Sequence, residues 1–181
     1  MKTTFLAALG FAGLFSLRVL AATPIDPALQ PKVDAKLKDI QAWAASPAIV
    51  EAVKAQNAQL PLDYAAMTQE KWKATTILDP FVRSFAKNAS AEFLKNKKSN
   101  ALSEAFLSDA NRLKIAFPSK TSNWSHKGKG KHDVPMTGKT WQGAIELDES
   151  TGLRQLEIAV PVLETGKPIG SLVVGLRINK L

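Results

Sequence analysis

Apolar residues recur at helical spacing soon after the N-terminal segment of this chain. Between residues 27 and 59 the recurring apolar positions are three or four residues apart: Val33, Leu37, Ile40 and Trp43. This spacing predicts the buried face of an amphipathic helix. Ser46-Pro47 interrupts the pattern, because proline lacks an N–H donor and clashes with the preceding turn. We therefore expect two consecutive helices, the second with Ser46 as its N-cap and Pro47 as its first residue.

Two further helices are expected before residue 95. Thr68 precedes a helical stretch over residues 70–77, and its hydroxyl suits the N-cap position. Asp79-Pro80 is another start signal, and the apolar residues behind it extend this helix to residue 94. The first half of the chain is therefore predicted to be helical.

After Asn100 the apolar pattern becomes that of strands. Two short strands, at residues 105–107 and 113–117, flank a turn in which we expect Asn111 to adopt the left-handed conformation. Three longer strands follow, separated by turns at residues 148–152 and 165–168; their apolar positions lie at 141–147, 156–162 and 172–178. Helices followed by antiparallel strands predict an α+β domain with its helices on one face of a single sheet.

Residues 120–138 form a long polar segment between the two groups of strands. A loop of this length in a compact domain is usually functional. Trp124 lies inside it and Trp141 opens the strand that follows, and aromatic side chains beside polar groups are typical of a small-ligand pocket. Two roles for Trp124 stay open: a pocket wall, or a core residue that pins the loop onto the sheet. The same two roles are open for Trp72.

The N-terminal segment has the three parts of a secretory signal peptide. A basic start precedes an uncharged apolar run over residues 5–17, and residues 19–21 resemble a cleavage site. As a helix this run would span about 20 Å, shorter than a hydrocarbon core of about 30 Å. We expect a signal peptide over 1–21, a lead-in over 22–32 and an exported, periplasmic domain over 33–181, without a membrane span or a cytoplasmic output domain. An uncleaved anchor is the alternative.

Positive charge is concentrated in the middle of the chain. The formal net charge is +8, and residues 91–140 contain 10 basic and 4 acidic side chains. The simplest interpretation is a solvated lysine-rich surface. The alternative function is a basic exported protein that binds an anionic polymer or a membrane surface through this segment. Because its lysines are not interleaved with aromatic residues at regular spacing, we expect no nucleic-acid partner.

The residues of the common catalytic sites are missing from the sequence. None of the 181 residues is cysteine, which excludes disulfides and thiol catalysis. No G-x-S-x-G elbow and no G-x-x-x-x-G-K-[ST] loop is present. His126, His132 and Asp133 could begin a metal site, but the lysines among them would repel a cation, so an exposed loop is expected there. We expect no catalysis, no metal and no cofactor.

Six segments stand in an order and spacing that is more specific than any one of them. They are IVEAVKAQN (49–57), Trp72 after Gln69-Glu70, EAFLSDAN (104–111), KTSNW (120–124), DESTG (148–152) and AVPVLETGKPIGSLVVG (159–175). Together they resemble the PDC-type extracytoplasmic sensor domains of the Cache superfamily, over about Val33 to Leu181. The resemblance implies a long N-terminal helix packed on a PAS-like, five- to six-stranded antiparallel sheet. It also implies a pocket for a small molecule, such as an organic acid or amino acid.

The resemblance further implies where the ligand binds. The candidate ligand-binding residues are Asn57, Trp72, Lys120, Ser122, Asn123, Trp124, Trp141 and Asp148. Asn57 and Asp148 are equally open to a structural role at a helix end and a turn. The family often has acidic residues where this chain has Asn123 and the lysines after it, which favours an anionic ligand with Lys120 as counter-charge. A freestanding module of this kind implies a partner, such as a membrane-bound sensor or transporter, and its N-terminal helix is a candidate homodimer interface.

Overall fold

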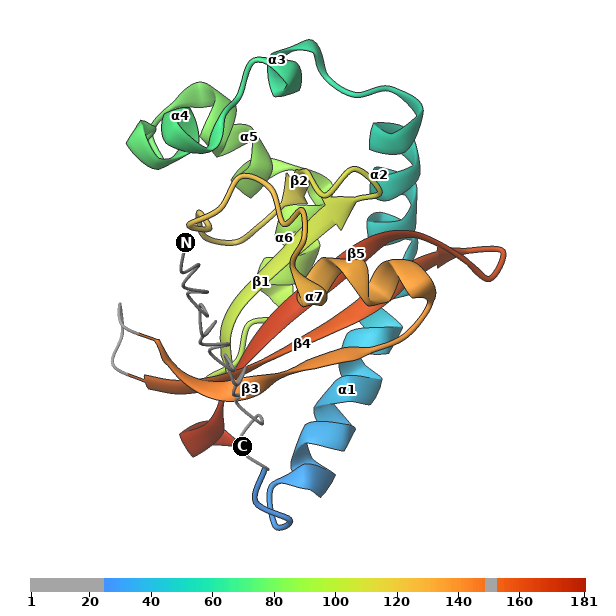
Figure 1. The fold of residues 1–181 in the computed structure, drawn as a ribbon, viewed down its shortest axis with the longest axis vertical. Helices are drawn as coiled ribbons and strands as arrows, with labels where there is room; N and C mark the ends of the chain where they lie inside the picture. Colours follow the sequence, from blue (N-terminus) through green and yellow to red (C-terminus); the bar gives the residue numbers. More distant parts are fainter. Residues whose placement is uncertain (1–24, 149–152) are drawn as a thin grey trace, which may run out of the picture.

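The computed structural model describes residues 25–148 and 153–181, and in this part of the chain five strands form one antiparallel sheet (Figure 1). The strands are β1 (Leu102–Asp109), β2 (Lys114–Ala116), β3 (Trp141–Asp148), β4 (Leu153–Glu164) and β5 (Lys167–Arg177). Their order across the sheet is β2-β1-β5-β4-β3, with every neighbouring pair antiparallel. The predicted α+β fold, a long N-terminal helix on a PAS-like sheet, is confirmed.

The helices precede the sheet, as the sequence pattern predicts. They are α1 (Gln30–Ala44), α2 (Pro47–Ala58), α3 (Leu62–Ala65), α4 (Gln69–Ala74), α5 (Pro80–Lys87) and α6 (Ala89–Asn96), with α7 (Gly130–Asp133) and the short 3-10 helices η1 (Pro135–Thr137) and η2 (Ile178–Lys180) after β2. The break between α1 and α2 falls at Ser46, whose backbone is extended, and Pro47 is the first helical residue. The expected cap bond is absent, because the Ser46 hydroxyl accepts no hydrogen bond from the helix.

The shorter helices begin where expected but end earlier. The Thr68 hydroxyl accepts a hydrogen bond from the backbone N–H of Lys71 at 3.2 Å, and the helix behind it ends at Ala74 instead of residue 77. The single helix expected over residues 80–94 is two helices, because Asn88 caps a new one. Its side chain accepts from a backbone N–H of α6 and donates to the carbonyl of Ile115 in β2 at 2.7 Å.

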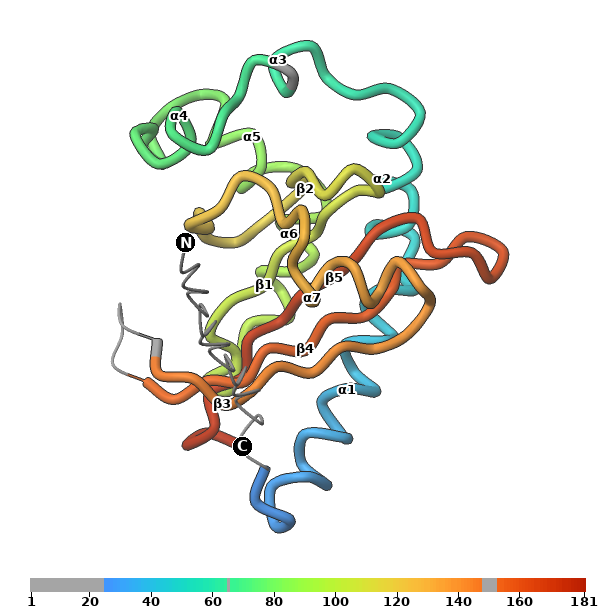
Figure 2. The backbone as a smooth tube through the Cα atoms, viewed as in Figure 1, coloured from blue at the N-terminus to red at the C-terminus, as the bar shows by residue number. Residues whose placement is uncertain are grey.

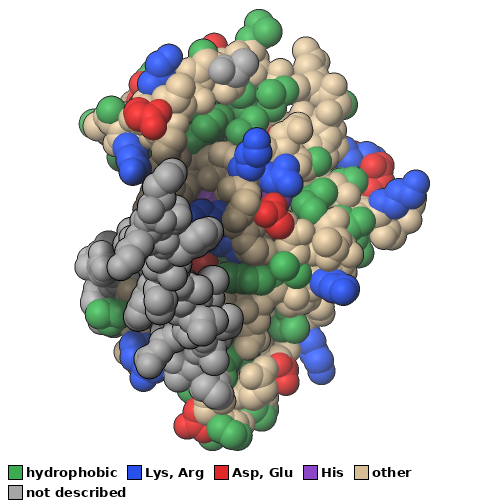
Figure 3. All heavy atoms as spheres, in the orientation of Figure 1, with side chains coloured by type: hydrophobic (Ala, Val, Ile, Leu, Met, Phe, Trp, Pro, Cys, Tyr) green, Lys and Arg blue, Asp and Glu red, His purple; other side chains and the backbone are tan. Residues whose placement is uncertain are grey.

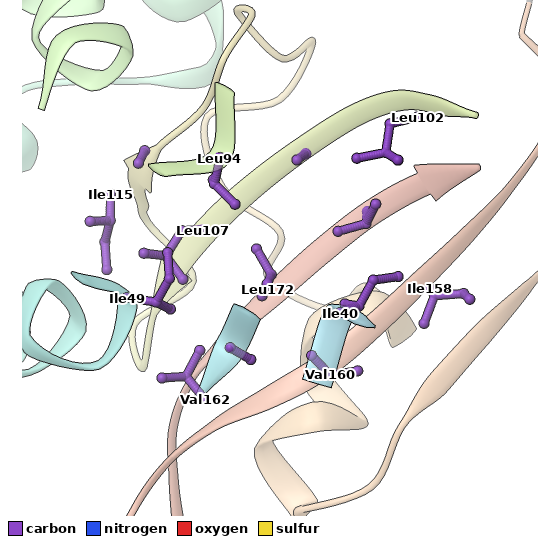
Figure 4. Close-up of a cluster of buried hydrophobic side chains, with 14 of the residues drawn as sticks. Ile40, Ile49, Leu94, Leu102, Leu107, Ile115, Ile158, Val160, Val162 and Leu172 are labelled. Atoms are coloured by element: carbon purple, nitrogen blue, oxygen red, sulfur yellow. The ribbon is translucent and has the colours of Figure 1, made fainter. Parts of the chain in front are cut away.

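One face of the sheet packs against α1, α2 and α6 (Figure 4). The alternating positions of β4 and β5 that the sequence assigns to the core are fully buried there: Leu156, Ile158, Val160, Val162, Leu172, Val174 and Leu176. Ile40 of α1 and Ile49 of α2 pack against them. This face supplies most of the apolar burial that stabilises the domain.

The other face of the sheet is also covered by helices, so the expectation that they lie on one face is wrong. Trp72 of α4, Phe85 of α5 and the loop residue Trp124 pack against Phe106 of β1 and Val173 of β5. β5 is buried on both faces from Gly170 to Leu176. The alternating apolar residues of β4 indicated burial of the first face alone. The second face is covered by side chains from short helices and a loop, which the pattern within β4 does not show.

The turn between β1 and β2 differs from the prediction in one residue. Arg112, not Asn111, has the left-handed backbone, with φ of 71°. Arg112 is held in place by its side chain and its carbonyl: its Nε donates to Asp133 at 3.1 Å, and the carbonyl accepts the N–H of His126 at 3.2 Å. The turn after β4 contains Thr165 and Gly166 at φ of 47° and 82°, where a turn was expected. The turn predicted at 148–152 falls largely outside the described residues.

The C-terminal end of the chain lies beside the start of α1 (Figure 2). Lys32 Nζ donates a hydrogen bond to the carbonyl of Leu181 at 2.9 Å. Over residues 25–148 and 153–181, no helix is both long enough and apolar enough to cross a membrane. The predicted signal peptide, residues 1–21, lies outside the described residues.

Candidate functional site

A cavity of about 370 Å³ opens on the second face of the sheet, beneath residues 119–126, here called the roof segment. In Figure 3, a purple His and blue Lys or Arg side chains are visible deep on the side facing the viewer. The cavity is lined by Ser103, Glu104, Phe106, Ser119, Lys120, Thr121, Ser122, Asn123, His126, Lys131, Glu146, Gln155 and Glu157. Its size is at the lower end of the range for small-molecule sites.

The floor of the cavity is an aromatic and basic stack, to which His126, the last residue of the roof segment, contributes its ring. The His126 ring lies parallel to Phe106, with 4.6 Å between ring centroids. Lys114 Nζ lies 3.7 Å from the Phe106 centroid and 2.6 Å from His126 Nδ1. Burial and, to a smaller extent, the nearby lysines lower the pKa of His126 to about 2, so its imidazole is neutral at physiological pH.

Both histidines of the long loop are buried, so the expected exposed loop is wrong at these two positions. His126 is 2% exposed and His132 is 1% exposed. His132 Nδ1 lies 2.6 Å from the hydroxyl of Ser171 on β5, and burial lowers the pKa of His132 to about 4. Part of the predicted loop is helical as well, at α7 and η1.

Lys114 is the exception among the lysines that were expected to be solvated. It has no exposed surface and forms no ion pair with a carboxylate in the described part of the chain. Burial holds its pKa well below the usual value, which favours the uncharged amine. The sequence marks this position only by its place between Leu113 and Ile115 in an apolar strand.

Two glutamates and a lysine form the wall opposite the roof segment. Lys131 Nζ contacts both carboxylate oxygens of Glu157, at 2.7 and 2.8 Å. Burial, followed by a hydrogen bond to Glu157, raises the pKa of Glu104 to about 7. Glu104, Lys131 and Glu157 are not among the ligand-binding residues predicted from the sequence. Gln155 and Glu157 occupy the polar positions in the alternation of β4.

Short helix α4 holds the roof segment in position. The side chain of Gln69 accepts the backbone N–H of Trp124 at 2.8 Å and donates to the carbonyl of Ser122 at 3.0 Å. Trp72 Nε1 donates to the carbonyl of Thr121 at 2.7 Å. Polar groups of the roof are thereby satisfied by neighbours with fixed rotamers, which keeps the lining side chains in a defined place.

Gln69→Ala is expected to loosen the roof segment and to destabilise the protein by about 1 to 3 kcal/mol, because it leaves the N–H of buried Trp124 without a partner. Amide hydrogen exchange should become faster over residues 119–126. Gln30→Ala is the matched control, since the Gln30 side chain bonds only to exposed Asp34. Equal exchange in both variants would show that Gln69 does not hold the roof.

The structure brings three of the predicted ligand residues together in the cavity: Lys120, Ser122 and Asn123. Trp124, which belongs to the roof segment and is 4% exposed, and Trp72, which is fully buried, do not line the cavity. Their rings pack 5.1 Å apart, in contact with Phe85. The two tryptophans therefore support the roof from the core side.

The remaining predicted residues lie beside the cavity or away from it. Trp141 lines a small hollow next to it, together with Glu146 and Glu157, which also line the cavity. Asn57 lies at the other end of the sheet, where its amide bonds to the carbonyl of Ile169 at 2.7 Å and to the N–H of Ala110 at 3.0 Å. The side chain of Asp148 is not among those described.

Another cavity, of about 330 Å³, lies between α1, β4 and the residues after η1. Gln41, Ala45 and Thr140 are among its lining residues, and no lining side chain is charged. The cavity beneath the roof segment instead combines charged groups of both signs with an aromatic floor, so it offers a ligand more polar contacts. Among the side chains that the structure describes, no three His, Asp or Glu residues are placed to hold a metal ion.

The lysines of residues 91–140 are dispersed over different environments. Lys114 is buried, Lys131 is paired with Glu157, and Lys95 Nζ lies 2.8 Å from a carboxylate oxygen of Glu92. Lys120 Nζ lies 4.9 Å from a ring centroid of Trp72. These four lysines therefore do not form one continuous basic surface of the kind that binds an anionic polymer.

No protein-family model matches the chain, and no curated protein sequence matches it. Among solved structures it is similar to the ligand-binding domain of the Pseudomonas aeruginosa PAO1 amino-acid chemoreceptor PctC in complex with GABA, with 11% identity over 84% of this chain and 56% of that one and a TM-score of 0.48. It is also similar to the sensor domain of the V. cholerae histidine kinase DctB (14% identity, 83% and 58% coverage, TM-score 0.39). A third is the ligand-binding domain of the Campylobacter jejuni chemoreceptor Tlp3 with 4-methylisoleucine (16%, 83% and 54%, TM-score 0.38).

Two of these structures are ligand-binding domains of chemoreceptors and one is the sensor domain of a histidine kinase. The chain spans 54 to 58% of their lengths.

Proposed function

We propose that this chain is a sensory module that binds a small polar metabolite carrying an anionic group in the cavity beneath the roof segment. The observation that carries the proposal is the cavity itself, about 370 Å³ with hydroxyl, amide and charged side chains on walls fixed by α4 and the sheet. A site of this construction recognises a ligand by a few directed polar contacts. No group in it is arranged as a nucleophile with an adjacent base, and the module acts by binding alone.

The charges of the lining indicate how the ligand would lie. Lys131 is already paired with Glu157, so Lys120 is the lining cation available to an anionic group. Ser122 and Asn123, close to Lys120 in the roof, offer hydrogen bonds to the same group. Glu104 and Glu146 on the opposite side accept hydrogen bonds, which favours a ligand with a donor group at its other end. The sequence predicted an anionic ligand. We now propose that the ligand carries a group rich in hydrogen-bond donors as well as the anionic group.

The location and partner of the module are part of the same proposal. With residues 1–21 as a signal peptide, the domain over residues 33–181 would act in the periplasm. Its occupancy would be read by a membrane-bound sensor or transporter, and α1 would pair two copies. Export can be measured directly: intact mass of the exported protein should correspond to a start near Ala22, and retention of residues 1–17 would contradict the signal peptide.

Lys120→Ala should weaken binding about tenfold, because it removes a charge-assisted contact to the anionic group. The ligand is first found by a thermal-shift screen of small metabolites, and affinities are then measured by calorimetric titration. Asn123→Ala should weaken binding as well. Lys127→Ala is the matched control, since Lys127 is exposed and does not line the cavity. If Lys120→Ala and Asn123→Ala both bind like the parent, the ligand does not occupy this cavity.

A further inference from the structure

A second cavity, of about 380 Å³, lies on the other side of the N-terminal half of β1. It is bounded by the end of α6, by residues 118–119 and by Arg177 of β5. It shares a wall with the ligand cavity at Ser103, Glu104 and Ser119. The proposed function makes no use of it.

The short length of β2 leaves this space open. β2 pairs with β1 at Leu107 and Ser108, and in the described part of the chain no strand continues along the earlier residues of β1. The pairing of β1 with β5 shifts register between Leu102 and Glu104, so Ser103 is a bulge residue. Its hydroxyl lies over Gly175 of β5, where a Cβ atom would collide with Ser103 Oγ. The bulge therefore places the Ser103 hydroxyl over the backbone of β5.

Two residues that line this cavity each have a buried polar atom without a hydrogen-bond partner among the residues that the structure describes. Arg177 Nε and Ser103 Oγ accept or donate no hydrogen bond within residues 25–148 and 153–181. Arg177 also forms no ion pair with any carboxylate of that part, while its backbone N–H is fixed to the carbonyl of Ala101 at 2.8 Å. Buried polar groups are nearly always satisfied, and an unsatisfied guanidinium nitrogen is costly. A bound oxyanion in the cavity would give the Arg177 guanidinium a charged partner.

The rest of the lining divides into a charged part and an apolar part. Lys98 adds an exposed ammonium, whereas Lys95 is engaged by Glu92. Glu104 is the one acidic residue of the lining, and burial raises its pKa to about 7, which weakens its repulsion of an anion. The apolar part consists of Leu94, Leu102, Ala105 and Pro118. A bare inorganic ion would leave this apolar surface uncovered in a space of this volume.

We propose that this second cavity binds an organic carboxylate with an apolar body, whose carboxylate pairs with the Arg177 guanidinium and whose body lies against the apolar part of the lining. Arg177 is the principal recognition residue, because its guanidinium fork matches a carboxylate. Lys98 at the mouth attracts the anion. This site is distinct from the proposed site of the sensory ligand. The proposal does not depend on which metabolite fills the first cavity.

Hexanoate is a direct probe, with hexanamide as its uncharged match and inorganic phosphate as an anion without an apolar body. Amide chemical-shift titration of the full domain should give saturable binding of hexanoate, at least tenfold tighter than hexanamide or phosphate. Arg177→Gln should weaken hexanoate binding at least tenfold, whereas Arg83→Gln, on the exposed side of α5, should not change it. Equal binding of phosphate and hexanoate, or equal affinity of parent and Arg177→Gln, would overturn the proposal.

Two exposed variants keep the test valid if Arg177→Gln does not fold. Lys98→Glu should weaken hexanoate binding and Lys38→Glu, on the exposed face of α1, should not. Asn123→Ala separates this proposal from the proposed function, because Asn123 lines the first cavity alone. If Asn123→Ala abolishes hexanoate binding, the carboxylate occupies the first cavity and the second site is wrong.

Discussion

Trp124→Ala is expected to lower the free energy of unfolding by about 3 to 5 kcal/mol, since it removes a buried indole from the core and leaves a cavity. The ring of Trp124 packs against Tyr64 at 5.2 Å, Trp72 at 5.1 Å and Phe81 at 5.7 Å. The melting temperature should fall by roughly 10 °C. These contacts, with 4% exposure, favour the core role over that of a pocket wall.

Stability and ligand affinity should be measured on the same Trp124 variants. Trp124→Phe keeps an aromatic ring in the cluster and should recover most of the lost stability, which thermal unfolding would report. Asn123→Ala, one residue away but in the cavity lining, should change affinity and leave the melting temperature nearly unchanged. A Trp124→Ala variant with the stability of the parent and weakened binding would instead place the ring in the pocket.

Lys114→Met is expected to change how stability depends on pH. In the folded protein burial lowers the pKa of Lys114, whereas in the unfolded chain the amine titrates near 10.5. Between these values the unfolded state binds one more proton, so the parent becomes more stable as pH rises, by up to about 1.4 kcal/mol per pH unit. Methionine has no proton to bind, and the variant lacks this slope.

The measurement is urea unfolding of the parent and Lys114→Met at pH 8.0, 8.75 and 9.5. The stability of the parent relative to that of Lys114→Met should rise with pH over this window. In this range the native His126, with a pKa of about 2, and the unfolded histidines are all neutral, and Glu104, with a pKa of about 7, is ionised in both states. Lys127→Met is the control, since Lys127 is exposed. Parallel pH profiles for the parent and Lys114→Met would show that the buried amine is charged.

Patterns that depend on neighbours along the chain were predictable from the sequence. The break at Pro47, the caps at Thr68 and Asp79, and the alternation in β4 are local consequences of backbone chemistry and of burial on one face. The motif resemblance added the correct fold class and placed Lys120, Ser122 and Asn123 near one another. These are the residues for which sequence position and spatial position coincide, because they follow one another in a single segment.

The parts that the sequence did not predict depend on contacts between distant segments. Lys114 and His126 resemble surface residues by type, yet both are buried because the roof segment folds back over β1. Glu104 and Glu157 are 53 positions apart and meet only when β1 and β4 lie on either side of β5. The left-handed residue moved from Asn111 to Arg112 for the same reason, since Arg112 has a tertiary partner in Asp133.

Amide chemical-shift mapping with the compound found in the thermal-shift screen tests whether the ligand binds in the cavity beneath the roof segment. If it does, the largest shifts should fall in the roof segment, residues 119–126, and beside Glu104 and Glu157 on the facing strands. Shifts should be small at Gln41 and Thr140, which line the uncharged cavity beside α1. Shifts that gather around Gln41 and Thr140, with the roof segment unaffected, would contradict the account.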